Sequence, residues 1–342
     1  MKRRLTAIIL IGILSAFTLT GCASSENDPK PLSVKALILP KFEVGEMAGD
    51  FPGEAQYYYE EYLDGGEAYT IKGTPGDITL YYKDGVALCP IGQGKISAAV
   101  NTSAILSDDR FDFSEATILS TGCAGSAEGY GIFGDVFVVS ANVDYELGHH
   151  ADPRDMEDDS KPTWFHTEDY DNIAVVSLNS ELTDTVYERV KNVRLETTEK
   201  TTAFLKKEYP AEEWANRLPQ VMRGTSVTAD NFWKGKADHR NAETMMEVYG
   251  CADPYAVTEM EDIAVARTVD RFGYLDKLID LRVSVNLDVF ASGSTPESLW
   301  GPSSEDSLAS DDSEESVDIF ETAMKNNFEV GRIIIDDILS DK

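Results

Sequence analysis

The sequence predicts an α/β fold in which helices cover both faces of a mixed central sheet. Short apolar runs that suit buried strands alternate with longer segments whose apolar residues recur three and four positions apart, the spacing of a helix. Hydrophobic residues make up 42% of the chain and charged residues 27%, which is typical of a folded globular protein and excludes a disordered one. In such folds, binding sites lie at the carboxyl ends of the strands.

The expected strands are short runs of aliphatic and β-branched residues bounded by glycine, proline or charged residues. They cover residues 34–39, 78–82, 86–88, 117–120, 136–141, 221–227, 255–257 and 278–284. The expected helices are amphipathic, so each can lay one apolar face on the sheet. They cover residues 96–106, 182–206, 241–249, 261–272 and 317–339.

The N-terminal segment predicts export from the cytoplasm. Basic residues at positions 2–4 precede an uncharged run at 5–20, which is too short for a comfortable membrane span. The run ends in Leu-Thr-Gly-Cys22, the spacing of a lipoprotein signal in which the cysteine is lipidated. We therefore expect a signal peptide at 1–21 and a lipid anchor on Cys22, at an extracytoplasmic site in the cell envelope. An ordinary signal peptide with a chance cysteine is the alternative.

The rest of the chain is expected to form one domain, at residues 34–342, behind a solvated tether at 22–33 that is rich in Ser, Asn, Asp and Pro. Two acidic stretches, 152–159 and 305–315, interrupt the alternation of strands and helices. Calcium binding would explain them, but neither has the ligand spacing of a calcium loop. We expect exposed loops instead, the second within an acidic loop at 303–316.

The charge balance excludes several classes of partner. The chain has 61 acidic against 30 basic residues, a net charge of -31, which would repel nucleic acid and an anionic membrane surface. After the N-terminal run no segment approaches the roughly 20 apolar residues of a membrane span, so we expect attachment through the lipid alone and no channel or carrier. Cys89, Cys123 and Cys251 are too few and too scattered for a disulfide framework or a metal site.

Two segments rich in small residues follow expected strands. In the first, Gly92, Gly94 and Lys95 lead into a helix, where free N–H groups and the positive helix end would attract an anion such as phosphate. Tight chain reversal is the alternative explanation for these glycines. We expect the second segment, 120–126, to be a turn at which a ligand approaches the backbone, with simple packing as the alternative.

Three further features carry polar or aromatic groups. Residues 258–262 place three carboxylates where a strand meets a helix, and helix capping accounts for only one or two of them. Phe232 and Trp233 are adjacent aromatics that suit a planar ligand, although taken alone they are better explained by core packing. His149 and His150 lack the spacing of a metal site.

Four motifs, in this order, carry a family resemblance: Gly92-Gln-Gly-Lys95, Ser120-Thr-Gly-Cys-Ala-Gly125, Gly134-Asp-Val-Phe-Val138 and Thr258-Glu-Met-Glu261. They resemble a Gly-x-Gly-Lys turn, an Asn-Thr-Gly-Ser-Ala-Gly turn, a Gly-Asp-Ile-Val strand and a Val-Glu-Met-Glu ribose motif of the nucleoside phosphorylase and nucleosidase superfamily. Segments 39–47, 144–150 and 253–262 look like purine nucleoside permeases within it. The resemblance covers about 34–339 but is weak over 152–218, which we interpret as an insertion. It implies a nucleoside phosphorylase-like fold.

The resemblance also implies roles in binding a purine nucleoside. Glu261 should accept hydrogen bonds from the ribose hydroxyls, Met260 should pack under the sugar and Phe232 should stack on the base. His149 or His150 should reach the 5′ hydroxyl. The remaining residues expected beside the substrate are Trp233, Cys123, Ala124 and Gly125.

The same resemblance indicates three candidate catalytic residues. It places an Asp or Asn beside the base near N7, and the chain offers both Asn286 and Asp288, with the spacing favouring Asn286. An asparagine cannot protonate N7 but can hydrogen-bond N7 and O6, so we expect inosine or guanosine in preference to adenosine. Glu43 lies near the position of a carboxylate that activates water, with an ordinary loop carboxylate as the alternative.

Two classes of function follow. The first is an enzyme that cleaves the N-glycosidic bond of purine nucleosides in uptake or salvage, with water or phosphate as the acceptor and no other cofactor. The second is a lipoprotein that binds nucleosides without cleaving them and serves a separate transporter. Both readings are compatible with a homo-oligomer.

Overall fold

The computed structural model describes residues 29–158, 160–210, 213–295 and 314–340. At its centre, five strands pair in a closed ring. Around the ring these strands are β8 (Val136–Asp144), β12 (Val221–Thr228), β13 (Tyr255–Glu259), β7 (Thr117–Ser126) and β14 (Leu278–Leu287). The pairs β8–β12, β12–β13 and β7–β14 are parallel, whereas β13–β7 and β14–β8 are antiparallel. The predicted mixed sheet is therefore confirmed.

Further strands extend the ring on both sides. From β7 the sheet continues through β2 (Ala36–Leu39), β5 (Val86–Leu88), β4 (Ile78–Lys83) and β3 (Glu67–Ile71), and β11 (Val175–Ser177) is added beyond β8. Short strands form two separate pairs. These are β1 (Leu32–Ser33) with β6 (Phe111–Asp112), and β9 (His149–His150) with β10 (Trp164–Phe165).

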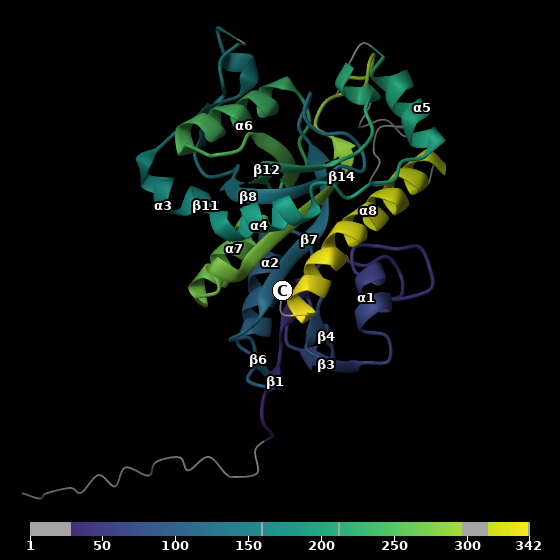
Figure 1. Cartoon of the computed structure of the whole chain (residues 1–342). Coiled ribbons are helices and arrows are strands. Elements are labelled where there is room, and N and C mark those ends of the chain that lie inside the picture. Colours follow the sequence, from purple (N-terminus) through teal and green to yellow (C-terminus); the bar gives the residue numbers. More distant parts are fainter. Residues whose placement is uncertain (1–28, 159, 211–212, 296–313, 341–342) are drawn as a thin grey trace, which may run out of the picture.

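Helices cover both faces of this sheet (Figure 1). The helices are α1 (Gln56–Tyr62), α2 (Lys95–Leu106), α3 (Asp171–Ala174), α4 (Ser180–Val190), α5 (Glu199–Glu208), α6 (Lys236–Tyr249), α7 (Asp262–Arg271) and α8 (Glu314–Leu339). Single turns of 3₁₀-helix lie at Pro153–Asp155, Glu168–Tyr170, Glu213–Asn216 and Leu275–Lys277. Among the described residues, no helix combines the length and the apolar character needed to cross a membrane.

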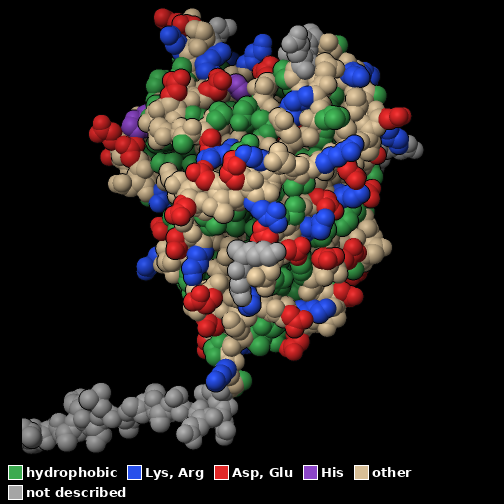
Figure 2. All heavy atoms as spheres, in the orientation of Figure 1, with side chains coloured by type: hydrophobic (Ala, Val, Ile, Leu, Met, Phe, Trp, Pro, Cys, Tyr) green, Lys and Arg blue, Asp and Glu red, His purple; other side chains and the backbone are tan. Residues whose placement is uncertain are grey.

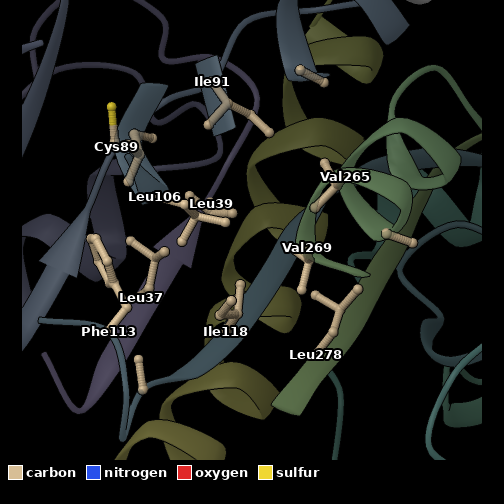
Figure 3. Packing of buried hydrophobic residues seen from close by; sticks show 14 of the residues in the cluster. Leu37, Leu39, Cys89, Ile91, Leu106, Phe113, Ile118, Val265, Val269 and Leu278 are labelled. Atoms are coloured by element: carbon tan, nitrogen blue, oxygen red, sulfur yellow. The ribbon is translucent and has the colours of Figure 1, made fainter. Parts of the chain in front are cut away.

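Strand β2 shows how the two faces arise. Its residues alternate between two hydrophobic clusters because successive side chains of a strand point to opposite faces. Leu37 and Leu39 join a cluster that includes Val265 and Val269 of α7 (Figure 3). Ile38 joins the other cluster, which includes residues of α1, α4 and α8. The expectation of helices on both faces is confirmed, and every residue of β2 is buried.

The structure corrects two expected elements. The helix expected at 182–206 is two helices, α4 and α5, because the Thr198 side chain accepts a hydrogen bond from the N–H of Thr201 and starts a new helix, while Leu195 in the linker is buried in the core. The small-residue segment 120–126 is not a turn. It continues β7, whose far end pairs with both β13 and β14.

Other differences concern the ends of the expected domain. Leu32 and Ser33, expected in the tether, form β1. The signal peptide, Cys22 and most of the acidic loop at 303–316 lie outside the described residues. The predicted insertion at 152–218 contains β11, which is an edge strand of the main sheet. On the face in Figure 2, acidic and basic side chains are interspersed, so this face offers no continuous basic patch to a polyanion.

Candidate functional site

A pocket opens where the carboxyl ends of β2, β7, β12, β13 and β14 meet. The space inside it is about 530 Å³, including open solvent at its mouth. Eight residues expected beside a substrate line it: Cys123, Ala124, Gly125, Phe232, Trp233, Met260, Glu261 and Asn286. The remaining lining residues are Lys41, Phe42, Glu54, Gln93, Ala229, Asn231, Thr258 and Glu259.

Glu261 is held rigidly at the floor of this pocket. It stands immediately before α7 and is 4% exposed. One carboxylate oxygen accepts a hydrogen bond from the N–H of Gly94 at 2.9 Å, and the other accepts one from Arg282 at 3.3 Å. Burial raises the pKa of Glu261, and Arg282 opposes this rise. Each oxygen keeps a further lone pair that a ligand hydroxyl can use.

The three carboxylates at 258–262 have separate tasks. Glu259 caps α7, because one of its oxygens accepts from the N–H groups of Glu261 and Asp262. Its other oxygen accepts from Ser226 and Thr228, and burial raises the pKa of Glu259 to about 7. Asp262 forms a buried ion pair with Arg282. Of the three, Glu259 and Glu261 line the pocket, and both carboxylate oxygens of Glu259 are already engaged by more than one donor.

The aromatic wall comes from the loop after β12. Phe232 is 66% exposed at the pocket mouth, so its ring is available to stack on a planar ligand. Trp233 stacks on Tyr145, with ring centroids 5.2 Å apart, and belongs to a core cluster as well as to the pocket. Both rings line the pocket, but Trp233 also packs against the core, whereas Phe232 is mostly exposed.

The opposite wall is the end of β7. Cys123, Ala124 and Gly125 line it as strand residues, and Glu54 accepts a hydrogen bond from the N–H of Cys123 at 2.7 Å. Gly125 is required here, because a Cβ would lie 2.2 Å from Asp288 and 2.6 Å from the Asn286 amide nitrogen. The absent side chain lets β14 approach with its polar groups.

Asn286 and Asp288 have different surroundings although both leave the same strand. Asn286 lines the pocket, whereas Asp288 does not. Asp288 is 1% exposed and accepts hydrogen bonds from Tyr255 and Thr258. Burial raises the pKa of Asp288 to about 7, and those hydrogen bonds oppose the rise.

The structure does not support the predicted anion site at the glycine turn. The N–H groups of Gly92, Gly94 and Lys95 donate to Lys41 O, Glu261 and Asp230, respectively. The Lys95 ammonium group donates to Asp144 and Glu146. Carboxylates of the chain itself therefore take the donors that a phosphate would need, and their charge would repel it.

Glu43 does not line the pocket, and its hydrogen-bond partners are backbone N–H groups. Its carboxylate accepts from the N–H groups of Val44, Gly53, Ala55 and Gln56, and so holds the loop that leads into α1. The predicted role in activating water is therefore not supported for Glu43. The nearby carboxylate that lines the pocket is Glu54, which is 6% exposed.

The histidine pair is also outside the pocket lining. His149 and His150 are exposed in β9, and His150 contacts the carbonyl of Tyr145 at 2.8 Å. They lie behind the aromatic wall because the Tyr145 ring stands between His150 and Trp233. Contact with a sugar 5′ hydroxyl would require movement of this short strand pair.

Lys41 and Arg282 are site residues that sequence reasoning missed or left without a role. Lys41 is buried under the pocket and donates to Ser120, and Arg282 joins Glu259, Glu261 and Asp262. The signal for both was a basic residue within an apolar strand or directly after one, where an unpaired charge would be costly.

A profile of the purine nucleoside permease (NUP) family matches residues 33–342, nearly the whole chain. The chain belongs to this family. A purine nucleoside permease from Candida albicans is 28% identical over 205 residues, which are 54% of this chain and 49% of that protein. A probable purine nucleoside permease from Schizosaccharomyces pombe is 26% identical over 213 residues, 56% of this chain and 59% of that one. The matched part thus spans about half the length of these relatives.

Solved structures with the same fold are 5′-methylthioadenosine/S-adenosylhomocysteine nucleosidases. The enzyme from Colwellia psychrerythraea, solved with adenine, has a TM-score of 0.53 and 15% identity, covering 90% of this chain and 96% of its own. The enzyme from Streptococcus pneumoniae, solved with 8-aminoadenine, has a TM-score of 0.54 and 12% identity, covering 88% and 99%. At this identity the likeness confirms the nucleoside phosphorylase-like fold that the motifs predicted.

Proposed function

We propose that this protein binds purine nucleosides in the pocket and cleaves their N-glycosidic bond. One observation carries the proposal. A buried carboxylate, an exposed aromatic ring and an amide, on Glu261, Phe232 and Asn286, line one pocket from three different strand ends. A ribose, a purine ring and a purine edge require these three kinds of group. The names of the relatives and the ligands of the related nucleosidases point to the same substrate class.

The chemistry of cleavage assigns work to two carboxylates. As the bond from C1′ to the base nitrogen breaks, positive charge develops on the sugar and the electron pair stays with the base. Glu261 stabilises the sugar cation and its hydroxyls. We propose that Glu54 takes a proton from the water whose oxygen bonds to C1′. Glu259 and Glu261 of the pocket pair with Arg282, whereas Glu54 has no salt bridge among the described residues.

We propose water in preference to phosphate as the acceptor. The observation behind this choice is the glycine turn, whose donors are bound to Glu261 and Asp230, with Lys95 neutralised by Asp144 and Glu146. A phosphate would have to displace carboxylates of the same charge. Water needs no such exchange.

A second function, binding without cleavage in the service of a separate transporter, is favoured by Asn286. An amide at the base edge cannot supply the proton that a departing base takes up.

In either function we propose that the protein acts outside the cytoplasm, tied to the membrane through lipid on Cys22, in nucleoside uptake or salvage.

The test is incubation of the purified protein with inosine or adenosine, with and without phosphate, followed by chromatography of the products. Free base and ribose without phosphate would support hydrolysis, and ribose 1-phosphate formed only with phosphate would contradict the choice of water. Binding in a calorimeter without products would favour the transporter-assisting function. If no nucleoside binds at millimolar concentration, the site assignment is wrong.

A further inference from the structure

Asp288 is a buried acid behind the pocket, and the function proposed above does not use it. The Tyr255 hydroxyl donates to one of its oxygens at 2.5 Å, and the Thr258 hydroxyl lies 2.9 Å from both. Two hydroxyl donors aimed at one carboxyl group are the surroundings of an ionised, acceptor-only carboxylate. The backbone carbonyl of Asp288 also accepts from the N–H of Gly235, which anchors the aromatic loop to β14.

Asp288 controls which end of the Asn286 amide faces it. The Asn286 amide nitrogen lies 3.5 Å from an Asp288 oxygen. The contact is long, but whether it is attractive or repulsive decides the orientation of the amide. An amide N–H beside a carboxylate is attracted, whereas the amide oxygen in that position would be repelled. The NH₂ group therefore lies on the side of Gly125 and Asp288, in the space that the missing Cβ of Gly125 leaves.

The amide oxygen is then the end that remains for a ligand. Asn286 lines the pocket, and no residue in the described part of the chain donates a hydrogen bond to its Oδ1. We propose that Asp288 is a positioning residue that holds the Asn286 amide oxygen toward the pocket, and that the site thereby selects purines with an N–H donor at position 6. This inference rests on the proposed nucleoside site.

The consequence reverses the preference expected from the sequence. A 6-aminopurine presents an N6–H donor beside N7, which matches an acceptor in the protein. A 6-oxopurine presents two acceptors, O6 and N7, and would leave its O6 facing the Asn286 oxygen without a donor. The sequence-based expectation of inosine or guanosine assumed that the Asn286 amide donates to the base. With the Asp288 carboxylate next to its NH₂ group, the amide offers its oxygen to the base instead.

The experiment compares the affinities of adenosine and inosine by calorimetry at pH 8.5, above the pKa of about 7 that burial gives Asp288. We expect the wild-type protein to bind adenosine at least tenfold more tightly, since a buried acceptor left unpaired weakens binding by about ten- to a hundredfold. In D288N the neighbour can donate or accept, so the Asn286 amide can turn and the ratio should fall at least fivefold.

Matched variants separate this role from a general loss of structure. Y255F removes a hydrogen bond to Asp288 but keeps the carboxyl group, and it should retain the wild-type ratio at a pH high enough to ionise Asp288 without that bond. If D288N does not fold, as judged by thermal unfolding, D288S takes its place with the same expected fall.

Several outcomes would overturn the inference. They are a wild-type preference for inosine, equal affinities in the wild type, and a ratio in D288N that equals that of the wild type. Failure of the proposed function itself would look different, because then neither nucleoside would bind to the wild-type protein.

Discussion

At the scale of single residues, Glu261 owes its position to partners from distant parts of the chain. The N–H of Gly94 and the Arg282 side chain each hold one oxygen of the carboxylate. Because both oxygens are fixed, the carboxylate would need no reorganisation to bind the ribose that we propose as its ligand, and such preorganisation is the condition for strong electrostatic stabilisation.

We predict that Glu261→Gln weakens binding or cleavage of ribonucleosides by about ten- to a hundredfold, because a charge-assisted hydrogen bond contributes about 1.5–3 kcal/mol. The 2′-deoxy counterparts should lose less, since they lack one hydroxyl. Calorimetry with adenosine, inosine and their 2′-deoxy forms measures the difference. An equal loss for both sugars would make Glu261 a structural carboxylate.

At the scale of elements, the loop after β2 assigns different tasks to two glutamates. Glu43 accepts from four N–H groups, two in the loop, of Val44 and Gly53, and two at the start of α1, of Ala55 and Gln56. Glu54 reaches back from the far end of the same loop, where it accepts from the N–H of Lys41 at 2.6 Å and faces the pocket. The two carboxylates are 11 positions apart, and the fold turns only the second toward a ligand.

We predict that Glu43→Gln lowers the free energy of unfolding by about 1–3 kcal/mol, because an amide turned toward backbone N–H groups leaves donors unsatisfied. Its cleavage rate, measured at a temperature where the variant is folded, should stay near that of the wild type. Glu54→Gln should reduce the rate about a hundredfold or more, the usual loss when a general base is removed. Urea unfolding and product chromatography on both variants make the comparison. The reverse pattern would restore Glu43 as the residue that activates water.

At the scale of the whole molecule, buried acids give stability a definite pH dependence. Burial raises the pKa of Asp288 and of Glu259 to about 7 each, well above the values near 4 of the unfolded chain. Between about pH 4 and pH 7 the folded state therefore binds more protons than the unfolded state. By linkage, this contribution to stability is complete below about pH 4 and is lost as the pH rises through 7. The net charge of -31 acts in the same direction.

We therefore predict that the free energy of unfolding decreases from pH 5 to pH 8, by up to about 1.4 kcal/mol per pH unit for each such group. Urea unfolding at four pH values measures it. Asp288→Asn removes one of the two groups and should flatten the curve. A stability that rises over this interval would contradict the prediction.

We propose that the location of the molecule depends on a single cysteine. We predict that Cys22→Ala leaves the protein uncleaved or released, because the variant lacks the residue that the lipid would modify. Membrane fractionation and gel mobility of the variant and its parent provide the test. Identical behaviour of the two would rule out the lipoprotein interpretation.

The sequence by itself determined the elements and their chemistry. The run 34–39 was predicted to be a buried strand because most of its side chains are aliphatic, and the structure has a strand at Ala36–Leu39. The order of strand, acidic residues and helix drew attention to 258–262, and the family resemblance then indicated roles for Met260 and Glu261. Such signals are local, so they survive without knowledge of the fold. The single helix expected at 182–206 was wrong. The Thr198 cap starts a new helix, and the burial of Leu195 in the linker depends on packing that the local sequence does not show.

Only the tertiary structure decided which polar groups meet. Glu43 and Glu54 look alike in sequence, yet hydrogen bonds to distant N–H groups place one in a loop and the other in the pocket. In the sequence, the N–H groups of the glycine turn appeared to be available for an anion. In the structure, the N–H of Gly94 donates to Glu261, which is 167 positions away. The ligand that we propose for Asn286 differs from the expected one because the fold places Asp288, which accepts from Thr258 of β13, next to the Asn286 amide. Hydrogen bonds and ion pairs act over a few ångströms, so the residues that satisfy one another are set by how strands are brought together and not by their order along the chain.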